Sequence, residues 1–153
     1  MIERDWLVSV CERLNEHGAR YVLFGGFAVQ LWGEARGTKD IDLLIERSVE
    51  NAARVLRALA ESGESLARTL TAAEVVSKPV TVIGDRPRVD IMTVAWAVHY
   101  PEAAAAARVF EVKGVKIPTA SIEHLIASKR TGRRRDAADI EALEEIARRL
   151  GRR

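Results

Sequence analysis

Two neighbouring stretches decide the fold of this chain, and they read Tyr21-Val22-Leu23-Phe24-Gly25-Gly26-Phe27-Ala28 and Gly37-Thr38-Lys39-Asp40-Ile41-Asp42-Leu43-Leu44-Ile45. The first is a short apolar strand that runs into two glycines, and a helix is predicted to follow over residues 27–32. The second is predicted to be a strand over residues 40–46, and it opens with two aspartates two residues apart. A flexible turn therefore stands close in the sequence to a strand that carries paired acids.

Asp40 and Asp42 lie on the same face of the predicted strand, because side chains alternate between the two faces of a sheet. Ile41, Leu43 and Ile45 point to the opposite face, toward a core. Two neighbouring carboxylates repel one another, and a divalent cation removes that repulsion. Carboxylate oxygens are hard ligands that suit Mg²⁺ or Mn²⁺. The alternation therefore predicts a metal site at the two aspartates.

Gly25 and Gly26 stand at the junction between the first strand and its helix. Glycine lets the backbone approach a ligand without obstruction by a side chain. The free N–H groups at the start of a helix favour phosphate. The two glycines therefore predict a phosphate-binding turn, and a tight turn without a ligand is the alternative.

The glycine pair and the Asp-x-Asp strand resemble the nucleotidyltransferase superfamily that includes polymerase β. The pattern of that family is an apolar residue, Gly, then Gly or Ser, a short spacer and Asp-x-Asp, and here residues 27–39 form the spacer. The family also carries a third carboxylate on a later strand, and Asp90 in the segment 88–92 is similar to it. The likeness is closest to small bacterial members related to abortive-infection toxins, and it extends over nearly the whole chain.

This resemblance implies a metal-dependent enzyme that moves an NMP from an NTP to a hydroxyl group and releases pyrophosphate. Asp40 and Asp42 would hold the metal against the triphosphate, and Asp90 would complete the site beside the acceptor hydroxyl and help to deprotonate it. Gly26 stands where many relatives carry serine, so that hydroxyl contact is absent and backbone N–H groups have to bind the phosphate. Thr38 either contacts the nucleotide or serves only the loop.

A charged segment precedes the last predicted helix, which covers residues 136–150. The toxin-like relatives carry a lysine, an Arg-containing loop and a pair of aspartates here, and by that resemblance Lys129 would reach the nucleotide phosphates. Arg133–Arg135 is either a phosphate or nucleic-acid contact or a solvated loop. Asp136 is interpreted as the N-cap of the helix, with Asp139 as the acidic residue three positions on.

The composition predicts one globular domain over residues 1–153. The chain has 48% hydrophobic and 30% charged residues and a net charge of only +2, so its overall charge does not indicate a partner. Cys11 is the single cysteine, which excludes an internal disulfide and fits a reducing compartment. The N-terminus lacks the pattern of a signal peptide and no apolar segment is long enough to cross a bilayer, so we expect a cytoplasmic protein without a membrane partner.

The remaining pattern predicts the α/β (α+β) nucleotidyltransferase fold, with a mixed, mostly antiparallel sheet backed by helices. Hairpins are predicted over residues 80–94 and 109–117, the second around Lys113-Gly114. Further helices are predicted over residues 2–17, 49–62 and 121–130, and one or two short helices over residues 94–107. A short helix is placed near residues 71–76, in the least regular part of the sequence.

The sequence does not specify the acceptor, which could be RNA such as a tRNA end, a protein or a small molecule. The alternative to an enzyme is a non-catalytic protein of the same fold that binds a nucleotide or a partner, such as one half of a toxin–antitoxin pair. A cognate antitoxin or partner protein is compatible with both interpretations. We interpret Trp6, Trp32 and Trp96 as core residues and not as groups that stack on a base.

Overall fold

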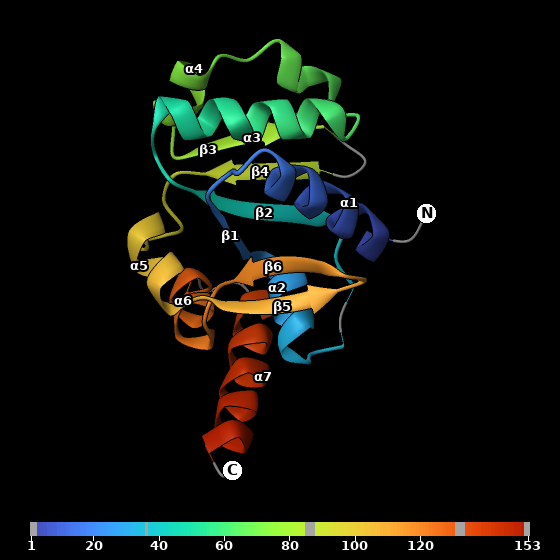
Figure 1. Cartoon of the computed structure of the whole chain (residues 1–153). Coiled ribbons are helices and arrows are strands. Elements are labelled where there is room, and N and C mark those ends of the chain that lie inside the picture. The colour runs from blue at the N-terminus through green and yellow to red at the C-terminus, as the bar shows by residue number, and fades with distance from the viewer. Residues whose placement is uncertain (1–2, 36, 85–87, 131–133, 152–153) are drawn as a thin grey trace.

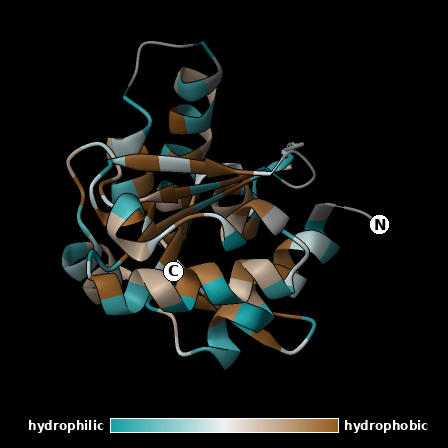
Figure 2. Ribbon diagram, turned by 90° about the horizontal axis from the view of Figure 1, so that it is seen from above, coloured by the Kyte–Doolittle hydropathy of each residue, from teal (hydrophilic) through white to brown (hydrophobic). Residues whose placement is uncertain are grey.

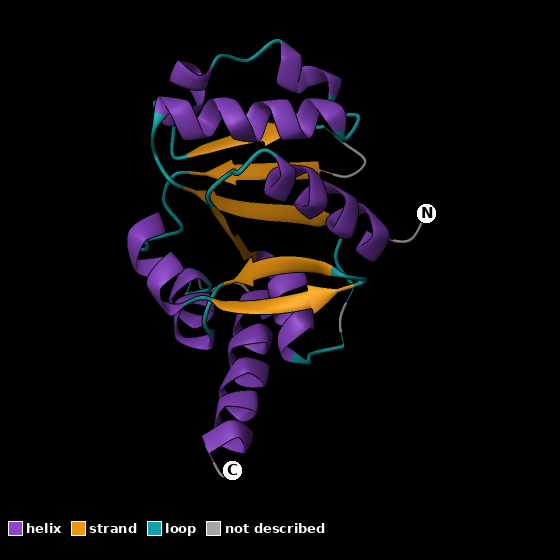
Figure 3. Cartoon of the chain, in the orientation of Figure 1, coloured by secondary structure: helices purple, strands orange, loops and turns teal. Residues whose placement is uncertain are grey.

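A six-stranded sheet forms the centre of the computed structural model, which describes residues 3–35, 37–84, 88–130 and 134–151 (Figure 1, Figure 3). The strands are β1 (Tyr21–Phe24), β2 (Asp40–Ile45), β3 (Val80–Ile83), β4 (Arg88–Met92), β5 (Arg108–Val112) and β6 (Val115–Thr119). The helices are α1 (Glu3–Glu16), α2 (Gly25–Trp32), α3 (Val49–Glu61), α4 (Ala72–Val76), α5 (Tyr100–Ala106), α6 (Ile122–Ser128) and α7 (Arg134–Gly151), with a 3₁₀ turn at Ser65–Arg68.

The sheet is mixed and mostly antiparallel, as the sequence predicts. Its strands follow the order β3-β4-β2-β1-β6-β5. The pairs β3–β4, β1–β2 and β5–β6 are antiparallel, whereas β2–β4 and β1–β6 are parallel. Each antiparallel pair joins strands that are consecutive in the chain, and the two parallel pairs assemble these units side by side. The strand β2, which carries the two aspartates, thereby lies inside the sheet between β4 and β1.

The two faces of the sheet have different roles. Ile41, Leu43 and Ile45 on β2 are completely buried, and they belong to the continuous apolar core. The helices α1 and α3 lie in front of the sheet in Figure 1, whereas α2 and α7 lie behind it. Hydrophobic residues are concentrated on the central strands between these helices (Figure 2). Burial of this apolar area fixes the register of β2, because a slip of one residue would exchange its two faces.

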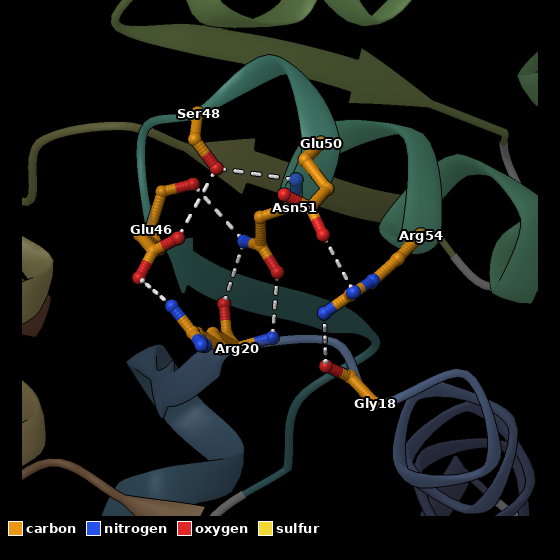
Figure 4. A network of polar contacts seen from close by, with 7 residues as sticks. All are labelled: Gly18, Arg20, Glu46, Ser48, Glu50, Asn51 and Arg54. Atoms are coloured by element: carbon orange, nitrogen blue, oxygen red, sulfur yellow. Dashed lines mark hydrogen bonds and ion pairs between the residues drawn. The ribbon is translucent and has the colours of Figure 1, made fainter.

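A polar network fixes the end of β2 that lies away from the aspartates (Figure 4). The buried Asn51 side chain accepts a hydrogen bond from the Arg20 N–H at 2.7 Å and donates to the carbonyl oxygens of Arg20 and Glu46, both at 3.0 Å. Ser48 accepts from the Asn51 N–H at 3.1 Å and caps α3. The start of β1 and the end of β2 are therefore tied to the first turn of α3, which holds the two strands in register.

Several boundaries differ from the prediction. The helix α2 begins on Gly25 and not at Phe27, so the glycine pair forms its first turn. The predicted helix near residues 71–76 is confirmed as α4, and Thr71 with Glu74 forms its capping box. The sequence predicts helical structure from residue 94, but residues 94–99 form a tight turn before α5. In this turn Ala95 and Val98 pair as a β-bridge. In the part of the chain that the structure describes, no helix combines the length and apolar character that a bilayer crossing requires.

Candidate active site

The strand pairing puts the three predicted acids on one face of the sheet. Because β2 and β4 are parallel and in register, Asp42 lies directly opposite Asp90, and Asp40 lies opposite Arg88. Asp40 and Asp42 share a face by the alternation of β2, and Asp90 joins it from β4. On the other side of β2, Phe24 pairs with Asp42, so the glycine turn that follows Phe24 lies beside the same carboxylate.

The Asp42 carboxyl group has a pKa far above the usual range for aspartate. Burial raises its pKa from 3.8 to about 7, and the negative charges of Asp90 and Asp40 and a hydrogen bond to Asp90 add to the rise. The positive charge of Lys129 lowers the pKa but does not offset these effects. A hydrogen bond between two carboxyl groups needs a shared proton. A cation at this place would take over the role of that proton.

The residues fit Mg²⁺ or Mn²⁺ by their chemistry, since all three are carboxylates on one face. Within the described ranges, however, no three acidic, histidine or cysteine side chains are already arranged as a metal-binding cluster. Asp90 instead accepts a hydrogen bond from Arg88, with 3.0 Å between Nε and Oδ1. Asp90 is therefore paired with this guanidinium while it also lies opposite Asp42.

Neighbouring side chains leave no room for a Cβ atom at Gly25 or Gly26. Gly25 has a φ of +71°, and a Cβ atom built on it would lie 1.9 Å from Asp42 Oδ2. A Cβ atom on Gly26 would lie 2.7 Å from both Cβ and Oγ1 of Thr38. The turn is therefore packed directly against the Asp42 carboxylate on one side and the Thr38 side chain on the other. No side-chain cap occupies the start of α2, so its backbone N–H groups remain available to a phosphate.

Replacing Gly25 with Ala is expected to destabilise the protein more than the same change at Gly18. Gly18 also has a positive φ, +65°, but nothing lies within 4 Å of its added Cβ atom. Gly18→Ala should cost about 1–2 kcal/mol for the left-handed backbone alone, whereas Gly25→Ala must also displace Asp42. Urea unfolding of the two variants measures the difference. Equal losses of stability would show that Asp42 is not held against Gly25.

Lys129 is the buried cation of the site, and its contacts correct the interpretation of Asp136. The Lys129 ammonium lies 2.8 Å from Asp139 Oδ2 and 3.6 Å from Asp136 Oδ1, and all three side chains are at least nine-tenths buried. The helix α7 begins at Arg134, so Asp136 is inside its first turn and is not the N-cap. Asp136 and Asp139 are thus ion-pair partners of Lys129. The predicted arginine segment is described only from Arg134, because residue 133 lies outside the described ranges.

A pocket of about 300 Å³ joins Asp42 to the Lys129 cluster. Its polar or glycine lining is Gly25, Asp42, Ser128, Lys129 and Asp136. Its apolar lining is Phe24, Val80, Met92, Val94, Ala95 and Trp96. Trp96 is 62% exposed, so the interpretation of this residue as part of the core is wrong. No residue in the sequence indicates an exposed turn here, because residues 96 and 97 include neither Gly nor Asn.

Asp42→Asn is expected to stabilise the metal-free protein at pH 8 but not near pH 4. Since the Asp42 pKa is raised on folding, the folded state binds more protons than the unfolded state between about pH 4 and pH 7. The free energy of unfolding contributed by Asp42 therefore falls as the pH rises through this window, and asparagine lacks the penalty. We expect a gain of roughly 1–4 kcal/mol at pH 8, measured by urea unfolding in EDTA. A gain that is independent of pH would contradict the assignment.

Two solved structures share this fold. An antigenic nucleotidyltransferase-like protein from Paracoccidioides brasiliensis is 20% identical in sequence, and the match covers 94% of this chain and 75% of that one with a TM-score of 0.61. A putative nucleotidyltransferase from Thermotoga maritima is 21% identical, with 100% and 97% of the chains covered and a TM-score of 0.55. No protein of curated function matches the sequence. At these identities the two structures establish the fold alone.

The sequence itself establishes the family. Residues 3–153 match a family described as "Nucleotidyl transferase of unknown function". The matched range includes the glycine turn, the strands that carry Asp40, Asp42 and Asp90, and the segment that carries Lys129. Family and fold therefore agree with the general kind of protein that the glycine and aspartate pattern resembles. The chain belongs to the nucleotidyl transferase family DUF2204.

Proposed function

We propose that the protein is a nucleotidyltransferase that moves an NMP from an NTP to a hydroxyl group. The observation that carries this proposal is the register of β2 and β4, which places Asp42 directly opposite Asp90 and beside the Gly25 turn. In the reaction, the acceptor oxygen bonds to the α-phosphorus and the bond from that phosphorus to the bridging oxygen of the β-phosphate breaks. Pyrophosphate leaves, and the acceptor loses its hydroxyl proton.

The residues of the chain have separate tasks in this proposal. The backbone N–H groups at Gly25 and Gly26 bind triphosphate oxygens, and Lys129 adds a positive charge from the pocket wall. Asp90 accepts the proton of the acceptor hydroxyl. Thr38 supports the glycine turn through its contact with Gly26.

The proposed cofactor is Mg²⁺ or Mn²⁺, held by Asp40, Asp42 and Asp90. When bound, the metal would neutralise these carboxylates and the phosphate oxygens and lower the pKa of the acceptor hydroxyl. The raised pKa of Asp42 supports this assignment, because the charge of Lys129 does not offset burial and the neighbouring carboxylates at Asp42. Hard oxygen donors on one face are also the ligand type that these ions prefer.

The acceptor is proposed to be a hydroxyl of RNA, a protein or a small molecule, and a tRNA end is attractive from the likeness to abortive-infection toxins. By the same likeness we propose a cytoplasmic toxin–antitoxin role with a cognate partner protein. The basic segment supports a phosphate-rich acceptor, since Arg130, which follows the buried Lys129 in the sequence, and Arg134 at the start of α7 are both exposed. A non-catalytic nucleotide-binding protein is the second candidate. The ion pair between Arg88 and Asp90 favours it, because the third carboxylate already has a cationic partner.

The experiment is a labelling screen. The protein is incubated with Mg²⁺ and each of the four NTPs labelled at the α-phosphate, together with total RNA, protein or small-molecule extract. The proposal expects label in one fraction with the wild-type protein and none with Asp42→Asn. Tight NTP binding without label in any fraction would favour the non-catalytic candidate.

A further inference from the structure

Trp96 occupies a backbone position that a tryptophan rarely adopts. Residues 96 and 97 form a two-residue turn that is closed by Ala95 and Val98, whose N–H groups donate to each other's carbonyl oxygens at 2.8 and 2.9 Å. Trp96 has a φ of +62°, whereas Ala97 is not among the positive-φ residues. A positive φ at the first central residue defines a turn that favours glycine at that place. A large ring is therefore held where local backbone preference disfavours it.

The turn presents this ring to solvent instead of burying it. Ala95 and Val98 are 3% and 5% exposed and anchor the turn in the core, whereas Trp96 is 62% exposed. Trp96 lines the same pocket as Asp42 and Lys129. Backbone strain of this kind persists where the surrounding structure enforces it, and it is concentrated at ligand sites. Core packing does not explain the residue, because its ring contributes little to the core.

The lining of the pocket combines two kinds of residue. Gly25, Asp42 and Lys129 supply backbone donors and charge, whereas Met92, Val94 and Trp96 supply apolar surface. A ligand that matches both kinds carries a phosphate group and a flat apolar ring. Nucleotides have this combination, and aromatic side chains stack on every base because each base has a π-face. The site of the proposed function therefore extends beyond its charged residues.

We propose that Trp96 is the stacking surface for a nucleobase and sets how tightly the site holds its nucleotide. This inference rests on the proposed function only for the identity of the ligand as a nucleotide. The base belongs either to the NTP donor or to the terminal nucleotide of an RNA acceptor. Both sources present the same ring to the same surface, and binding measurements separate them.

Trp96→Gly tests this role without damage to the fold, since glycine is the residue that the turn favours. Relief of the backbone strain should raise the melting temperature by about 2–4 °C. Loss of one stacked base should weaken binding of the base-carrying ligand by about 5- to 150-fold. Isothermal titration of the full chain with Mg²⁺-ATP, the other three NTPs and a mixed-sequence RNA octamer measures this loss. Inorganic tripolyphosphate has no base, and its affinity should not change.

The matched control is Lys113→Gly. Lys113 has a φ of +50° at the tip of the β5–β6 hairpin, at the opposite edge of the sheet from β3, so the change removes a side chain from a similar backbone position away from the pocket. Its affinity for every ligand should equal that of the wild type. A loss confined to the NTPs identifies the donor base, and a loss confined to the RNA octamer identifies the acceptor base; either result supports the proposal.

Unchanged affinity of Trp96→Gly for the NTPs and for the RNA would overturn the proposal. A lower melting temperature together with weaker binding of tripolyphosphate would also overturn it, because that result is expected if Trp96 only stabilises the fold. The measurement is independent of transfer. If base-dependent binding requires Trp96 but no label is ever transferred, the inference holds and the proposed function fails. If transfer occurs but Trp96→Gly changes neither NTP binding nor RNA binding, the function holds and the inference fails.

Discussion

Asp90→Asn is expected to leave Mg²⁺-NTP binding largely intact and to slow transfer by about 10²–10⁴-fold. The asparagine keeps the size of the side chain and an oxygen that can accept the hydrogen bond from Arg88, but it cannot accept the proton of the acceptor hydroxyl. Asp90 lies on β4, across from Asp42, whereas the glycine turn lies beside Asp42 on the other side of β2. On this placement we propose that Asp90 serves the acceptor and Asp42 the triphosphate.

Asp42→Asn is the comparison that tests this division. Because Asp42 lies against the Gly25 turn, its loss should weaken both binding of the metal–nucleotide complex and transfer. Titration of both variants with a non-hydrolysable NTP gives the binding, and single-turnover labelling gives the transfer rate. Arg88→Gln is a further control, since it frees Asp90 from its ion pair while all three acids remain. Identical behaviour of the two aspartate variants would remove the assigned division of roles.

Lys129→Met is expected to lower the free energy of unfolding by about 3–5 kcal/mol. The Lys129 ammonium is paired with Asp139 at 2.8 Å and with Asp136 at 3.6 Å, and the side chains are only 10%, 3% and 3% exposed. Methionine retains most of the apolar volume but removes the charge, so both buried carboxylates lose their ion pair with Lys129. Urea unfolding at pH 7 measures the loss.

Two controls separate this effect from a general loss of a lysine. Lys113→Met breaks an exposed ion pair with Asp5 and should cost less than about 1 kcal/mol. Adding Asp136→Asn and Asp139→Asn to Lys129→Met should recover part of the stability, because the buried negative charges are then removed as well. A loss at Lys129 no larger than the loss at Lys113 would show that the cluster is not a buried ion pair.

The sheet and its acidic face could be predicted because local patterns determine them. The alternation around Ile41 and Leu43 fixes which way Asp42 points, and the apolar strand before Gly25 places the glycine turn. Asp90 was expected at the site because the segment 88–92 resembles the strand that carries the third carboxylate of the family. The parallel pairing of β2 and β4, which brings Asp42 and Asp90 opposite each other, was not specified by either strand alone.

The rest of the site depends on contacts between distant segments. An aspartate three residues before another acidic residue is a common helix start, so the sequence favours a capping role for Asp136 and Asp139. Their ion pairs with Lys129 form only in the folded chain and cannot be predicted from this local pattern. Arg88 could be placed on the site face, but its ion pair with Asp90 could not be predicted. Trp96 was assigned to the core because a large aromatic residue is usually buried. In the structure its neighbours Ala95 and Val98 form a bridge, and the turn between them exposes Trp96.

The most direct test of the central claim compares two positions of the label. The wild-type protein, Asp42→Asn and Asp90→Asn are incubated with Mg²⁺, an acceptor extract and an NTP labelled at either the α- or the γ-phosphate. Transfer of an NMP predicts that the α-label enters the acceptor, that the γ-label appears in pyrophosphate, and that both aspartate variants reduce the two signals together. No label in the acceptor from either position, or entry of the γ-label into it, would contradict the account.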